Sequence, residues 1–311
     1  MKVFYNLSEV KKDNNTVLTL GTFDGIHLGH KKIIDRLIEK ASEIKGRSFL
    51  ITFDPHPRNV LSESKIKLLN TLSEKLEILN SFGIENVFVI NFTKEFSQNS
   101  SEDFIKNYII DKIGIREIII GYDHHFGKGR GGDENTLKEL GLEYNFNISK
   151  VEAVNIGDVT VSSTKIRNAL HNGDVKLANL LLGRYYSFVG NVIKGDGRGK
   201  ELGFPTANIK LDNETKLLPA IGIYVVELIV EDNKFYGLMS IGKRPTFYID
   251  GQVTTEIYIF DFDENIYGKN VKVNMIERIR GEEKFSSADE LVIQMNKDKN
   301  VGLEILNKLT N

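Results

Sequence analysis

The chain has 311 residues, 41% of them hydrophobic and 27% charged, which is typical of folded domains and long enough for about two of them. Its 41 Lys and Arg against 43 Asp and Glu give a net charge of -2, which argues against a protein that binds nucleic acid through a generally basic surface. The absence of cysteine excludes disulfides, zinc–thiolate sites and thiol catalysis. No apolar run reaches the ~18 residues of a membrane span, and the first residues lack the apolar core of a signal peptide. We therefore expect no membrane partner, no nucleic-acid partner and a cytoplasmic location; no pattern indicates an oligomeric state.

The first half alternates apolar runs with amphipathic patterns. The runs that suit buried strands are 17–20, 48–53, 86–90 and 117–120, and helical patterns cover 33–44, 71–79 and 100–113. This alternation predicts an α/β domain with a mainly parallel sheet. Because such sheets bind ligands at the carboxyl ends of their strands, the loops after these runs are the candidate site.

The stretch at 17–30, VLTLGTFDGIHLGH, contains two histidines at the transition from the first predicted strand to a predicted helix. A helix start favours a phosphate, and imidazoles there can donate hydrogen bonds to its oxygens. Gly29, between His27 and His30, lets a nucleotide lie close to the backbone. The alternative is that both histidines are surface-turn residues, which the register of strand, glycines and helix disfavours.

Two later segments add groups that suit an anion. The loop at 121–132, GYDHHFGKGRGG, places histidines and cations among glycines after the fourth strand. The segment VSSTKIR at 161–167 precedes a short helix, where its hydroxyls are either N-caps or, with the two cations, an anion clamp.

From Arg184 onward, short strand-like runs follow one another without helices, which predicts an antiparallel barrel. The runs are 185–193, 207–211, 223–230, 235–241, 254–260 and 271–279. Two helices, from Ser287 and from Val301, are expected to end the chain. The predicted domains are therefore 1–183 and 184–311.

The loop GDGRGKELGFPTAN at 195–208 has glycines and two cations that can wrap a polyphosphate. Thr206 and Asn208 alternate in a strand and so share a face, where a hydroxyl and an amide oxygen can hold Mg²⁺. Glu256 shares a face with Thr254 and Tyr258. It is a candidate functional residue only if that face is directed toward the phosphate loop. The alternative readings are an ordinary hairpin loop and a solvated glutamate. The phosphate-binding candidates of this loop are Gly195, Arg198, Gly199 and Lys200.

In combination, these segments resemble the bacterial bifunctional riboflavin kinase/FAD synthetase family over nearly the whole chain. GTFDGIHLGH, TFDPHP, GYDHHFGKGRGG and SSTKIR resemble its adenylyltransferase module, and GDGRGKELGFPTAN, SIGKRPTF and TTEIYIFDF resemble its kinase module. The resemblance implies a Rossmann-like nucleotidyltransferase domain, then a riboflavin kinase β-barrel with C-terminal helices. The implied substrates and products are riboflavin, FMN, FAD and ATP, with Mg²⁺ as cofactor.

The resemblance also assigns roles. It implies that His27 and His30 stabilise attack on the α-phosphate of ATP, that Thr206 and Asn208 bind Mg²⁺, and that Glu256 is the base of the kinase. It implies ATP contacts in the first module from Gly21, Phe23, Asp24, Gly29, Asp123, Ser163, Thr164 and Arg167.

Two positions depart from the family pattern. His124-His125 stands where Phe-Arg is more usual, so a phosphate contact is either supplied by a histidine or absent; Ser240 stands where asparagine is common. The alternatives that remain are a monofunctional flavin kinase and a flavin-sensing module without catalysis.

Overall fold

The computed structural model describes residues 1–195, 199, 202–243 and 253–310. The chain divides into two compact units, Met1–Ser162 and Ser163–Asn311. Within the part of the chain described, no helix is both long and apolar enough to cross a membrane.

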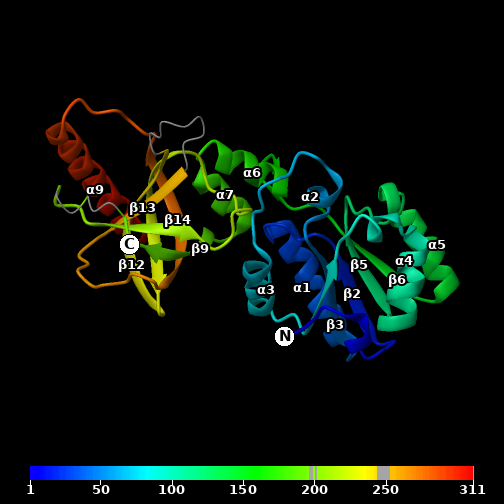
Figure 1. Cartoon of the computed structure of the whole chain (residues 1–311). Coiled ribbons are helices and arrows are strands. Elements are labelled where there is room, and N and C mark those ends of the chain that lie inside the picture. The colour runs from blue at the N-terminus through cyan, green and yellow to red at the C-terminus, as the bar shows by residue number, and fades with distance from the viewer. Residues whose placement is uncertain (196–198, 200–201, 244–252, 311) are drawn as a thin grey trace. The chain divides into compact units, whose positions relative to one another are not determined.

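The first unit is built on a six-stranded sheet in the order β1-β4-β3-β2-β5-β6, with every pair parallel (Figure 1). The four predicted strands are confirmed as β2, β3, β4 and β5. The strands β1 and β6 were not predicted, because these short edge strands are only partly buried and lack a continuous apolar run. The strands are β1 (Lys2–Phe4), β2 (Thr16–Leu20), β3 (Arg47–Asp54), β4 (Asn86–Asn91), β5 (Glu117–Gly121) and β6 (Asn147–Val151).

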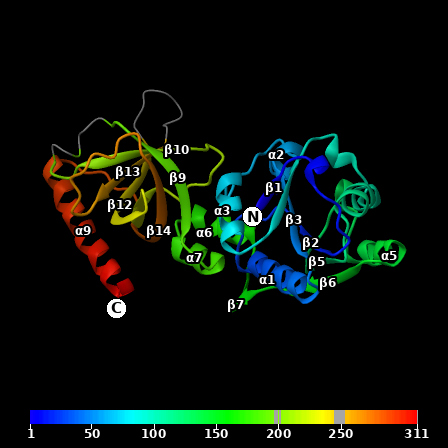
Figure 2. The same ribbon diagram turned by 90° about the horizontal axis from the view of Figure 1, so that it is seen from below.

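Helices cover both faces of this sheet and so give the unit two apolar cores (Figures 1 and 2). On one face lie α1 (Leu28–Glu43) and α3 (Leu72–Ser81), and on the other lie α4 (Ser101–Phe104), η3 (Ile105–Ile113) and α5 (Glu134–Tyr144). The helix expected over 100–113 begins as α-helix but continues as π-helix in η3. The shorter elements are η1 (Leu7–Glu9), α2 (Pro57–Leu61), η2 (Phe96–Gln98), η4 (Lys128–Arg130), β7 (Asn155–Ile156) and β8 (Val159–Thr160).

The second unit contains a closed antiparallel barrel in the order β10-β13-β12-β11-β14-β9, which confirms the predicted architecture. Inward residues alternate with outward ones along the strands, for example in β9, where every second residue is buried. The strands are β9 (Tyr186–Ile193), β10 (Thr206–Leu211), β11 (Gly222–Val230), β12 (Asn233–Lys243), β13 (Val253–Ile259) and β14 (Asn270–Arg280).

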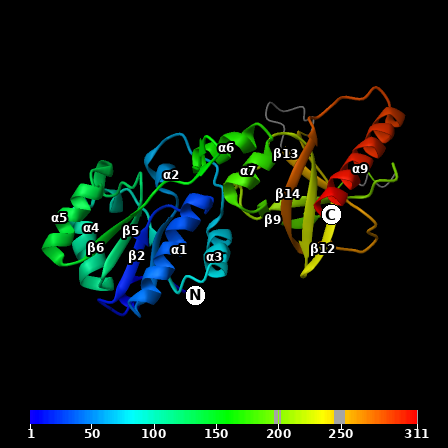
Figure 3. The same cartoon turned by 180° about the vertical axis from the view of Figure 1, so that it is seen from behind.

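A single helix, α9 (Ala288–Thr310), packs on the outside of the barrel against β11, β12 and β14 (Figure 3). The prediction of two C-terminal helices is therefore wrong. The polar stretch between the two apolar patterns stays helical because Asp298, within it, is buried and bound by Arg280.

Two further helices, α6 (Ser163–His171) and α7 (Val175–Leu182), belong to the second compact unit. The Asn179 side chain joins α7 to the barrel, because its Nδ2 donates to the Met275 carbonyl at 2.9 Å and its Oδ1 accepts from the Tyr186 amide at 2.6 Å. The functional boundary near Gly183 stays a prediction, since compactness alone does not say where each activity resides.

Candidate functional site

The turn that joins β2 to α1 has an unusual backbone. Phe23 and Ile26 have positive φ values of 46° and 37°, a conformation that side-chain-bearing residues rarely adopt. Both side chains are almost fully buried, so burial of their apolar surface offsets the backbone strain. The turn therefore has one fixed shape, and that shape positions the residues after it.

The two histidines meet at the start of α1. His27 is the N-cap, and its Nδ1 accepts a hydrogen bond from the His30 amide at 3.3 Å. A neutral His27 therefore carries its proton on Nε2, which is directed away from the helix cap. The two rings stack with centroids 3.7 Å apart, and Phe23 packs edge-on against His30 at 5.1 Å. A Cβ at Gly29 would lie only 3.1 Å from the His27 ring, so glycine there makes room for that ring.

Two buried charged residues lie in and next to the turn. Asp24 is 3% exposed, and its Oδ1 accepts hydrogen bonds from the Leu69 amide at 3.0 Å and the Asn70 amide at 3.3 Å. Lys75, on α3, donates to the Thr22 carbonyl at 2.7 Å. Burial lowers the pKa of Lys75 to about 8, against the opposing effect of the carboxylates of Asp24 and Asp54.

Sequence reasoning missed Lys75, although the pattern contained a signal. Lys75 lies three residues after Leu72 and four before Leu79, so it falls within the apolar stripe of α3. A lysine in that stripe is either buried or extended along it with its ammonium in water. Only the packing of α3 against the sheet shows that it is buried.

The loop after β5 places its two histidines differently. His124 stacks on Phe126 with centroids 5.7 Å apart, and its Nε2 is shielded from solvent without a hydrogen-bond partner among the described residues. Burial, together with the charges of His125 and Arg130, lowers the pKa of His124 to about 4. His124 is therefore neutral near pH 7 and does not replace the positive charge of an arginine. Asp123 and His125 are exposed beside it.

The remaining first-module candidates are placed as follows. Gly21 follows β2, and a Cβ there would lie 3.2 Å from the Phe23 ring. Ser163, Thr164 and Arg167 lie in α6, within the second compact unit. Their predicted contact with ATP stays a prediction. His56, in the TFDPHP segment, accepts a hydrogen bond from the Arg58 amide and caps α2, which supports a structural role.

In the barrel, the predicted kinase residues lie on adjacent strands. Asn208 on β10 pairs with Glu256 on β13, which pairs with Ser240 on β12. Two positions further along, Thr206 pairs with Tyr258. Thr206 Oγ1 donates to Glu256 Oε2 at 3.1 Å, so the hydroxyl, the amide and the carboxylate share one face. The expected alternation is confirmed, and the pairing between strands brings the two motifs together.

The ends of the glycine-rich loop lie against these same residues. A Cβ at Gly195 would lie 2.0 Å from Asn208 Nδ2, and a Cβ at Gly199 would lie 2.3 Å from the Phe204 carbonyl and 3.2 Å from Thr206 Oγ1. Only glycine allows the backbone to approach this closely. The phosphate-loop candidates Arg198 and Lys200 lie outside the described residues.

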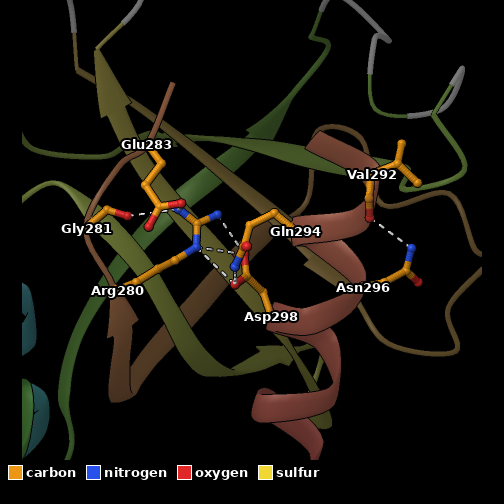
Figure 4. Close-up of polar contacts among 7 residues, drawn as sticks. All are labelled: Arg280, Gly281, Glu283, Val292, Gln294, Asn296 and Asp298. Carbon is orange, nitrogen blue, oxygen red and sulfur yellow. Dashed lines mark hydrogen bonds and ion pairs between the residues drawn. The ribbon is translucent and has the colours of Figure 1, made fainter. Parts of the chain in front are cut away.

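Paired residues on neighbouring strands connect Glu256 to Arg280, which binds α9. Ser240 pairs with Ile223, and Ile223 pairs with Arg280 at the end of β14. Arg280 donates to both carboxylate oxygens of Asp298, from Nε at 3.0 and 3.1 Å and from Nη2 at 2.8 Å (Figure 4). The outer face of the barrel that carries Glu256 is thus also the face against which α9 is held.

Comparison with known proteins agrees with this two-site arrangement. The family model for FAD synthetase matches residues 9–165, and the family model for riboflavin kinase matches residues 182–306. Proteins from Bacillus subtilis and Buchnera aphidicola, each named bifunctional riboflavin kinase/FMN adenylyltransferase, are 38% and 35% identical to this chain. The first alignment covers 94% of this chain and 93% of the relative, and the second covers 96% of each.

A solved structure shares the whole fold. A crystal structure described as a macrolide-efflux protein from Streptococcus pneumoniae matches with a TM-score of 0.88 and 30% identity. The match covers 97% of this chain and 98% of that one, so both units have counterparts there.

Proposed function

We propose, from the premise that this chain belongs to the family of bifunctional riboflavin kinase/FMN adenylyltransferases, that it converts riboflavin to FMN and then FMN to FAD. The barrel carries the kinase, and the parallel-sheet domain carries the adenylyltransferase. Each reaction consumes one ATP. The observation that carries the kinase assignment is the cluster of Thr206, Asn208 and Glu256 on β10 and β13, in which Asn208 pairs with Glu256 and Thr206 donates to it.

In the kinase, Glu256 accepts the proton of the terminal ribityl hydroxyl of riboflavin. That oxygen forms a bond to the γ-phosphorus of ATP while the bond to the β-phosphate oxygen breaks, so FMN and ADP are formed. Because Thr206 donates its hydroxyl hydrogen to Oε2 of Glu256, its oxygen lone pairs are turned away from the carboxylate and Oε1 can receive the substrate proton.

The donor set of this face fits Mg²⁺. Thr206 and Asn208 offer a hydroxyl and an amide oxygen, and a magnesium ion held by few protein ligands keeps sites for waters and nucleotide phosphates. When bound, the ion would neutralise charge on the transferring phosphate. The close approach of Gly195 and Gly199 to the same two residues puts backbone N–H groups beside the place where those phosphates would lie.

In the adenylyltransferase, an FMN phosphate oxygen forms a bond to the α-phosphorus of ATP, and pyrophosphate leaves as the α–β bridging bond breaks. A phosphate is already ionised, so the step needs no general base. His27 and His30 stabilise the charge that builds on the α-phosphate, together with the N-terminus of α1. The capping bond of His27 Nδ1 supports this role, because it fixes the ring proton of a neutral His27 on Nε2.

The further ATP contacts are part of the same proposal. Gly29 and Gly21 shape the turn, and Asp123 is exposed at the end of β5. Phe23 and Asp24 are buried, which favours a supporting position under the nucleotide over a broad contact with it. On the family resemblance, Ser163, Thr164 and Arg167 of α6 are also proposed to contact ATP.

Product analysis tests the two reactions separately. Wild-type enzyme given riboflavin, ATP and Mg²⁺ should yield FAD through FMN. Glu256→Gln should make no FMN from riboflavin but should still make FAD from supplied FMN. His27→Asn, which keeps an N-cap acceptor, should accumulate FMN without FAD.

The alternatives predict other product patterns. FMN as the only wild-type product would indicate a monofunctional kinase, and no product would indicate a flavin-sensing module. Equal loss of both activities in His27→Asn would contradict the assignment of one reaction to each unit.

A further inference from the structure

Lys75 links three elements beneath the histidine turn. Only 6% of the residue is exposed, and its Nζ donates to the Thr22 carbonyl at 2.7 Å and to Thr52 Oγ1 at 3.1 Å. Thr52 Oγ1 in turn donates to the same Thr22 carbonyl at 3.2 Å. The three groups form a closed triangle that ties α3 and β3 to the first peptide of the turn after β2.

That peptide is the point at which the backbone becomes strained. The Thr22 carbonyl belongs to the peptide plane that precedes Phe23, so its direction sets the φ of Phe23, which is 46°. The Phe23 ring then packs on the His30 ring at 5.1 Å, and His30 stacks on His27. A rotation of the Thr22 carbonyl would therefore be passed on to both imidazoles.

We propose that Lys75 is a positioning residue for adenylyl transfer, which holds the Thr22–Phe23 peptide and thereby fixes His27 and His30 in their reactive orientation. Lys75 is too deeply buried to reach ATP itself, so it acts through the turn. This inference rests on the proposed adenylyltransferase function of the first unit.

A purely structural role explains the residue poorly. Burial disfavours the charged form of Lys75, and an apolar side chain of similar length would fill the same space at lower cost to folding. The Thr22 carbonyl would still keep its bond from Thr52. A buried cation that lowers stability but restrains a strained turn is typical of residues retained for function.

The first test is Lys75→Met, assayed for both reactions in the same preparation. We expect kcat for FAD formation from FMN to fall by ~10²-fold, as misplaced catalytic groups typically cause. KM for ATP should change less than about threefold, because the residue does not contact ATP. Riboflavin kinase activity should stay within about twofold, and the midpoint of chemical unfolding of the first unit should not fall.

The second test restores the amine. The chain has no cysteine, so Lys75→Cys introduces one unique thiol. Alkylation of the unfolded variant with bromoethylamine, then refolding, gives an amine of nearly lysine length; iodoethane gives the matched neutral side chain. The aminoethyl form should regain at least ~10-fold in kcat for FAD formation over the ethyl form.

Three results would overturn the inference. The first is FAD formation by Lys75→Met within about twofold of wild type, and the second is equal FAD formation by the aminoethyl and ethyl forms. The third is loss of both the kinase and the adenylyltransferase activity in Lys75→Met, together with a lower unfolding midpoint. If wild-type enzyme itself makes no FAD from FMN and ATP, the proposed function fails first, and this control separates that failure from the role of Lys75.

Discussion

The ion pair between Arg280 and Asp298 offers a quantitative test of how α9 is held. The Asp298 side chain is 5% exposed, and it accepts from Arg280 Nε and Nη2 and from Gln294 Nε2 at 2.9 Å (Figure 4). Asp298→Ala leaves a guanidinium that is 15% exposed and that still contacts the Gly281 carbonyl at 3.0 Å, the Glu283 carboxylate at 4.0 Å and the Phe285 ring at 5.8 Å from its centroid.

Removing one partner of a buried pair costs ~3–5 kcal/mol, and the remaining contacts of Arg280 place this case near the lower limit, about 3 kcal/mol. Since ~1.4 kcal/mol is a factor of ten, opening of α9 should become about 10²-fold more frequent. Hydrogen exchange of the α9 amides, followed by mass spectrometry under conditions where exchange reports the opening equilibrium, measures this directly.

A matched control is available on the same helix. Asn296 Nδ2 donates to the Val292 carbonyl at 2.9 Å in an exposed position, so Asn296→Ala should change exchange by less than about threefold (Figure 4). Riboflavin kinase activity should fall in Asp298→Ala, because Lys299 of α9 contacts the hydroxyl of Tyr258, which shares its face of β13 with Glu256, and FAD formation from FMN should be unaffected. Equal exchange rates in the two variants would show that the Arg280–Asp298 pair does not hold α9 on the barrel.

Two further predictions concern Gly195 and the titration of Lys75. Gly195→Ala places a Cβ 2.0 Å from Asn208 Nδ2, so we expect at least ~10-fold loss of kinase kcat/KM for ATP, with FAD formation from FMN as the internal control; kinase activity equal to wild type would show that the loop does not need this close approach. The pKa of Lys75 is lowered from 10.5 to about 8, a difference worth about 3 kcal/mol, so the unfolded state binds more protons between these pH values. Stability of the first unit should therefore contain a contribution that rises from pH ~8 to ~10.5, and this contribution should be missing in Lys75→Met; the charges of Asp24 and Asp54 oppose the lowering of the Lys75 pKa. Denaturation midpoints of the two proteins across that interval test the sign, and parallel curves would contradict it.

The sequence by itself determined the two architectures. Hydrophobic periodicity located β2 to β5, α1 and all six barrel strands, because buried strands and amphipathic helices impose patterns that a single chain must carry. The alternation of residues in β10 and in β13 also placed Thr206 with Asn208, and Glu256 with Tyr258, on shared faces before any contact was known.

Tertiary structure alone decided which of those faces meet. The register between β10 and β13 sets Asn208 opposite Glu256, and strand register depends on closure of the whole barrel, which no local pattern specifies. The continuity of α9 likewise depends on a partner 18 residues away, since Asp298 stays helical where Arg280 reaches it. Lys75 is the clearest case: a lysine within an apolar stripe is compatible with solvent or with burial, and only the packing of α3 over Thr22 and Thr52 places its charge beneath the histidine turn.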